Sequence, residues 1–109
     1  MAKTIEITYE GEVYTLEYTR RIVKDMEDGG FSLAAMNNKP VTMFPILFAG
    51  AFRCHHRKLR KEKVEEIYNH LVGKEDLAEV LLEMYTEAID TLFDEPEEGE
   101  KNAQWKSNF

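Results

Sequence analysis

Apolar and polar residues alternate with a period of two over residues 3–18, a pattern that is typical of half-buried β-strands. The alternation is interrupted at Glu10-Gly11, where glycine supplies the positive φ that a tight turn needs. We therefore predict a β-hairpin with a two-residue turn. Its apolar residues meet on one face in this register: Tyr9 opposite Glu12, Ile7 opposite Tyr14, and Ile5 opposite Leu16.

After the hairpin, the apolar residues recur at the spacing of amphipathic helices, and we predict four helices. The first runs from a cap at Thr19 to Asp28 and stops at two glycines. Residues 31–38 are expected to form a loop or a single turn. The second helix begins near Thr42, whose hydroxyl would cap it, and Pro45 would lie in its first turn. The third and fourth are predicted over about 61–72 and 76–93.

The second predicted helix is apolar over most of its circumference. From Met43 to Phe52, only Pro45 and Gly50 are not counted as apolar. A helix of this composition is normally central in its domain, and this one is too short to span a bilayer core of about 30 Å. The predicted fold class is α+β, mainly helical: an N-terminal β-hairpin followed by about four helices packed around a central apolar helix. The predicted core residues are Met43, Phe44, Leu47, Phe48, Phe52, Leu77, Leu81 and Met84.

The last predicted helix has more apolar surface than one neighbouring helix can cover. Leu82, Ile89 and Phe93 form a second apolar stripe beside its main apolar face. This stripe either binds a partner or is covered by the hairpin or the first helix. The open edges of the hairpin are a further place where a partner's strand could add.

The composition changes at Glu95, so we predict a single globular domain over residues 1–94 and a flexible acidic tail over residues 95–109. Trp105 stands out in this tail, because a lone tryptophan often anchors a short binding motif. The residues predicted to bind a partner are Leu82, Tyr85, Ile89, Phe93 and Trp105.

The formal net charge is −7, from 14 basic and 21 acidic residues. This balance argues against nucleic acid as the default partner, because phosphate binding depends on the density of Lys and Arg. Residues 53–63 are the exception, since Glu62 is their only acidic residue among many basic ones. This segment is either a solvated helix end or a dock for an acidic protein or for nucleic acid. It contains no aromatic residue to stack on a base.

Cys54-His55-His56 is the only cluster that suggests chemistry. Adjacent histidines on a helix point about 100° apart and do not chelate one ion as an i,i+4 pair does. A cysteine at the end of an apolar helix normally just packs. We therefore predict no enzyme activity, no metal and no cofactor. A single cysteine and a first segment without an apolar run predict a protein of a reducing cytoplasm without a signal peptide.

The order of several short segments resembles the small tail assembly chaperones of long-tailed (siphovirus-type) phages and prophages. After the hairpin, these segments are 29–33 (GGFSL), 39–43 (KPVTM), 45–52 (PILFAGAF), 55–56 (HH), 81–85 (LLEMY) and 102–105 (NAQW). The resemblance covers nearly the whole chain. It implies a non-enzymatic chaperone that binds the phage tape-measure protein and helps recruit tail-tube subunits, in the host bacterial cytoplasm and absent from the mature virion.

The implied partners are therefore the tape-measure protein and the tail-tube protein. A homo-oligomer is also possible in this interpretation, and no binding to a membrane is expected. Two other interpretations remain. One is a small nucleic-acid-binding regulatory protein that uses the basic segment 53–63. The other is a structural virion component that assembles through the hairpin edge.

Overall fold

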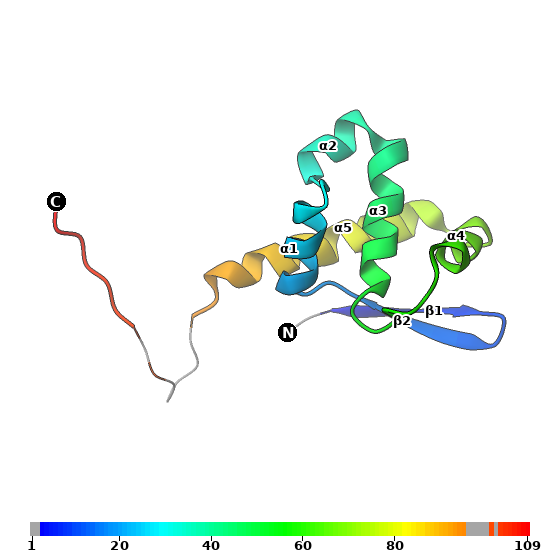
Figure 1. Cartoon of the computed structure of the whole chain (residues 1–109), viewed down its shortest axis with the longest axis horizontal. Coiled ribbons are helices and arrows are strands. Elements are labelled where there is room, and N and C mark those ends of the chain that lie inside the picture. Colours follow the sequence, from blue (N-terminus) through cyan, green and yellow to red (C-terminus); the bar gives the residue numbers. More distant parts are fainter. Residues whose placement is uncertain (1–2, 96–100, 102) are drawn as a thin grey trace.

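A computed structural model describes residues 3–95, 101 and 103–109 (Figure 1). A two-stranded antiparallel hairpin at the N-terminus is followed by helices, so the predicted α+β, mainly helical class is confirmed. Figure 1 shows the hairpin along one side of the helical body and α2 on the far side from it. The elements are β1 (Thr4–Tyr9), β2 (Glu12–Glu17), α1 (Arg20–Asp28), α2 (Leu33–Asn38), α3 (Pro40–Phe52), α4 (Lys61–Asn69), α5 (Lys74–Asp90) and the 3-10 turn η1 (Thr91–Phe93).

The hairpin has the predicted register, with Tyr9 opposite Glu12, Ile7 opposite Tyr14, and Ile5 opposite Leu16. Both turn residues have positive φ, 50° at Glu10 and 81° at Gly11. Two positive φ values define the turn whose twist matches that of the strands. The turn therefore strains Glu10, because a residue with a Cβ rarely adopts this conformation.

Two helix beginnings follow from side-chain caps. Thr19 accepts a hydrogen bond from the Ile22 N–H at the start of α1, as predicted. Ser32 does the same for the Ala35 N–H and starts α2. The prediction of a loop or single turn over residues 31–38 was therefore wrong, because the Ser32 cap begins a six-residue helix.

The central helix α3 begins two residues before the predicted cap. Lys39 precedes it without a side-chain cap, Pro40 is its first residue, and Thr42 lies inside it. The reason is that proline's fixed φ suits the first helical position, where its missing N–H has no partner. Pro45 consequently lies within the helix instead of its first turn.

The boundaries of the last two helices also differ from the prediction. α4 ends at Asn69 instead of Val72, and α5 begins at Lys74 instead of Asp76. Gly73, with φ of 79°, immediately precedes α5 and does not end α4. At the other end, α5 stops at Asp90 and continues as η1 to Phe93.

α3 is the centre of the core, as predicted, because it contacts β2, α1, α2 and α5. All eight predicted core residues, from α3 and α5, are either buried or packed against the buried cluster. Met43, Leu47, Phe48, Phe52, Leu81 and Met84 are buried, whereas Phe44 and Leu77 are half-buried against that cluster.

Gly50 allows α3 to approach α1 closely. A Cβ at this position would lie 2.5 Å from Met26 Sδ. At that distance one of the two must move, so the small residue has a packing reason inside a helix where glycine is otherwise unfavourable.

The N-terminus is fastened to the last helix. The Lys3 ammonium lies 2.7 Å from Glu83 Oε1 and 3.0 Å from Glu87 Oε1, both on α5. The hairpin therefore packs against the helices at its open end.

The predicted tail falls partly outside the described residues, at 96–100 and 102. Lys101 and residues 103–109 form neither helix nor strand and are exposed. None of the described helices combines the length and the apolar character needed to cross a membrane.

Candidate functional site

Tyr85, one of the predicted partner-binding residues, belongs to the core. Its side chain is only 1% exposed, and its ring packs edge-on against Tyr18 and Phe31, with centroids 5.4 and 5.1 Å away. Burial raises the pKa of Tyr85 to about 12. The prediction was wrong for this residue, because α5 is oriented so that Tyr85 shares the buried face with Leu81 and Met84.

Leu82 and Ile89 are half-buried and pack against the core cluster. Part of the second stripe is therefore covered within the chain. This is the alternative that the sequence left open. Only the end of the stripe, at Phe93, remains open to a partner.

The last turn of the α5 region carries the exposed apolar residues, and we call Leu92 and Phe93 the apolar end. Leu92 is 59% and Phe93 82% exposed. Both residues lie in the 3-10 turn η1, which buries none of its residues. Trp105 and Phe109, further along the chain, are also exposed.

Acidic residues surround the apolar end. Asp90, Asp94 and Glu95 are all exposed. Large exposed apolar side chains that are surrounded by charged residues are a common feature of protein-binding sites.

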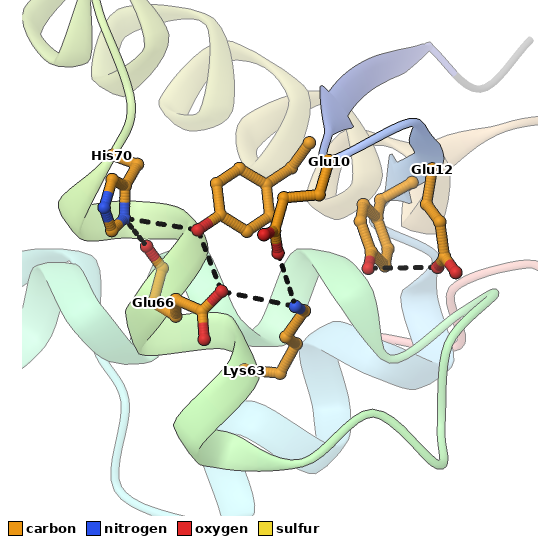
Figure 2. A network of polar contacts seen from close by, with 7 residues as sticks. Glu10, Glu12, Lys63, Glu66 and His70 are labelled. Atoms are coloured by element: carbon orange, nitrogen blue, oxygen red, sulfur yellow. Dashed lines mark hydrogen bonds and ion pairs between the residues drawn. The ribbon is translucent and has the colours of Figure 1, made fainter.

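The turn end of the hairpin, which we call the hairpin tip, is held in place by polar contacts (Figure 2). The Tyr9 hydroxyl donates to Glu66 Oε2 at 2.8 Å, and the Lys63 ammonium lies 3.1 Å from Glu10 Oε1 and 3.2 Å from Glu66 Oε2. The hydrogen bond from Tyr9, followed by that from Lys63, lowers the pKa of Glu66. Hydrogen bonds to Glu10 and then Glu66 raise the pKa of Lys63. The hairpin tip is thereby held on α4.

The histidine pair fixes the middle of the hairpin. The Thr15 N–H, which points away from β1, donates to His56 Nε2 at 2.9 Å. His55 Nε2 lies 2.7 Å from Glu17 Oε1. His56 also packs edge-on against Tyr14. No pattern in the sequence indicated these contacts, because the partners are 38 and 41 residues apart.

Among the residues that the structure describes, Glu17, Cys54 and His55 form a group that could hold a metal, since their donor atoms lie within 4.8 Å of one another. Zinc accepts carboxylate, thiolate and imidazole ligands. However, Glu17 and His55 already bond to each other, and structural zinc sites normally use four protein ligands. Burial, followed by the charge of Glu17, raises the pKa of the Cys54 thiol and disfavours the thiolate. We therefore assign this group to hairpin docking.

The basic segment has free cations. Lys63 is used at the hairpin tip, but the other five basic residues are exposed and have no ion pair with any residue that the structure describes. They are Arg53, Arg57, Lys58, Arg60 and Lys61.

An apolar groove of about 290 Å³ lies between α3 and α4, beside the basic segment. Its walls include Pro45, Phe48, Val64 and Tyr68, and Lys61 and Glu65 are its charged residues. Phe48 and Tyr68 stack edge-on with centroids 5.3 Å apart, so the groove has an aromatic floor.

A family model described as "Domain of unknown function (DUF5055)" matches residues 1–109, so the chain belongs to the DUF5055 family. No curated protein and no solved structure matches the chain.

Proposed function

We propose that this chain is a non-enzymatic, protein-binding chaperone of the phage tail assembly type that its sequence resembles. Its client is the tape-measure protein, and it helps to recruit tail-tube subunits in the host bacterial cytoplasm. One observation carries the proposal: large apolar residues stay exposed beside acidic ones at the C-terminal side of a folded body. Phe93 and Trp105 are 82% and 87% exposed.

Exposed aromatic residues of this kind suit a client that is apolar and helical. Aromatic side chains supply much of the binding energy at protein interfaces. The surrounding carboxylates of Asp90, Asp94 and Glu95 favour clients with basic residues next to their apolar stretches. A tape-measure protein is a long helical chain, and its apolar segments need cover until the tube encloses them.

Co-expression of the full chain with tape-measure fragments, followed by pull-down, tests the proposal. We expect at least one apolar fragment to be retained, and Phe93→Ala and Trp105→Ala to weaken its binding by about tenfold or more each. Val72→Ala is the matched control, because Val72 is 94% exposed but lies away from the apolar end. Failure of the folded wild-type chain to retain any fragment would contradict the proposal.

The nucleic-acid interpretation keeps a specific observation in its favour, namely the five exposed cations between Arg53 and Lys61. A gel shift at physiological salt separates the two functions. Binding that disappears in Arg57→Glu/Lys58→Glu but survives in Phe93→Ala would favour nucleic acid. Detection of the chain in purified phage particles would instead favour a structural virion component.

A further inference from the structure

The two ends of this molecule are complementary in charge and in apolar character. Figure 1 places α4 at one end of the helical body and the end of α5 at the other. The groove between α3 and α4 has Lys61 and Glu65 as its charged lining residues, and the exposed Arg60 directly precedes Lys61 in the chain. The apolar end at Leu92 and Phe93 is bordered by exposed carboxylates.

The groove suits an aromatic side chain. Its volume of about 290 Å³ accommodates a phenyl ring, and its lining includes the half-buried ring of Tyr68, which packs edge-on against the buried ring of Phe48. An aromatic ring placed edge-to-face or offset against another ring is stabilised beyond the burial of its area. Phe93 is the most exposed large apolar residue of the helical body apart from two valines. The chain therefore contains both an exposed ring, that of Phe93, and a groove large enough to bind a ring.

One copy cannot satisfy this match by itself, because its groove and its apolar end lie at opposite ends of a folded body. We propose that the chain self-associates head to tail, with Phe93 of one copy seated in the α3–α4 groove of the next. In this arrangement Asp90 and Asp94 face Arg60 and Lys61 of the second copy. Glu65 lies at the same groove and limits the attraction, so the contact is weak and reversible.

The groove and the apolar end are different surfaces, so a two-fold axis cannot relate the two copies at this contact. Such a contact generates a ring if the rotation between copies closes, and an open chain if it does not. The inference goes beyond the proposed function, since its partner is a second copy. The two share Phe93, so a client that binds the apolar end would displace the neighbouring copy.

Sedimentation velocity of the full chain over a range of concentrations is the first test. We expect association at about 50 mM salt that weakens at about 500 mM salt, because the charged rims are exposed and screened. A chain that remains monomeric at low salt and high concentration would overturn the proposal.

Charge reversal at each end is the second test. Arg60→Glu/Lys61→Glu disables the groove, and Asp90→Lys/Asp94→Lys disables the apolar end. We expect each variant to raise the dissociation constant by about tenfold or more. Arg21→Glu/Lys24→Glu on α1 is the control, since it reverses two exposed cations away from both ends and should associate like the wild type. Circular dichroism verifies that every variant is folded.

Mixing the two disabled variants gives the sharpest outcome. The first retains an apolar end and the second retains a groove, and their two altered ends carry opposite charges, so an equimolar mixture should regain the association that each variant loses alone. A mixture that stays monomeric would overturn the head-to-tail arrangement, as would single variants that still associate like the wild type.

The client experiment keeps the two proposals apart. The groove variant Arg60→Glu/Lys61→Glu leaves the apolar end intact, so it should lose self-association but still bind tape-measure fragments. Loss of association with retained client binding supports both proposals. Association without any client binding would contradict the proposed function alone.

Discussion

The hairpin tip and the end of α5 are both small projecting parts of the same fold, but they differ in how their side chains are satisfied. At the tip, Tyr9, Lys63 and Glu66 bond to one another and join the turn to α4. At the end of α5, Leu92 and Phe93 are exposed and their acidic neighbours form no ion pair with the part of the chain that the structure describes. The difference indicates that the hairpin end maintains the fold, whereas the α5 end is available for binding.

The largest expected effect is the loss of stability in Tyr85→Ala. It is compared with Phe93→Ala, which removes an aromatic ring from the end of the same helical segment. Tyr85→Ala should lower the free energy of unfolding by about 3–5 kcal/mol, because it leaves a large cavity between Tyr18 and Phe31. Phe93→Ala should change it by about 0.5 kcal/mol or less, since the ring is exposed. Urea unfolding measures both. Equal losses of stability would show that Phe93 is structural.

The second prediction concerns the bond that holds the middle of the hairpin. His56→Ala leaves the Thr15 N–H without its acceptor and removes the contact with Tyr14, so we expect a loss of about 1–3 kcal/mol. His55→Ala is the matched control, because His55 is more exposed and its bond to Glu17 is worth less. A larger loss for His55→Ala than for His56→Ala would contradict this assignment.

The polar contacts of the tip should respond to acid. The pKa of Glu66 is lowered from its ordinary 4.5, first by the hydrogen bond from Tyr9 and then by Lys63. The carboxylate therefore stabilises the fold above pH 4.5, and this contribution is lost as the pH falls through the lowered pKa. Glu66→Gln should reduce the decline of the urea midpoint between neutral pH and that range. An unchanged decline would mean that other carboxylates cause it.

The smallest expected effect is at the turn. Glu10 has a φ of 50°, which asparagine tolerates better, so Glu10→Asn should stabilise the chain by about 0.5–1 kcal/mol. Glu10→Gln removes the ion pair with Lys63 but retains the strain, and should be neutral or slightly destabilising. Thermal unfolding of both variants separates backbone strain from charge.

Local chemistry in the sequence predicted the parts of the fold that depend on neighbouring residues. The alternation on both sides of Glu10-Gly11 determined the hairpin register, and the hydroxyl of Thr19 marked the start of α1. The start of α3 was wrong because two prolines, at 40 and 45, each allow a helix to begin nearby, and only packing decides between them.

The candidate site was harder to predict, because exposure depends on how α5 rotates against the core. Tyr85 and Phe93 look alike in an amphipathic pattern, but one is buried and the other is exposed. The bond between Thr15 and His56 joins residues 41 positions apart, and no spacing rule reaches that far. The groove between α3 and α4 likewise exists only once both helices are packed.

The ion pairs of Lys3 with Glu83 and Glu87 have a consequence for how the chain is made. Lys3, directly before β1, meets Glu83 only after 80 more residues have been translated. Tyr18 and Phe31 must also wait for Tyr85. Since residues are added at about 5–20 per second, the emerging hairpin and α1 spend several seconds without the helix that covers them. A chain that ends before residue 85 would therefore lack the ring that packs against Tyr18 and Phe31, and that part of the core would stay open.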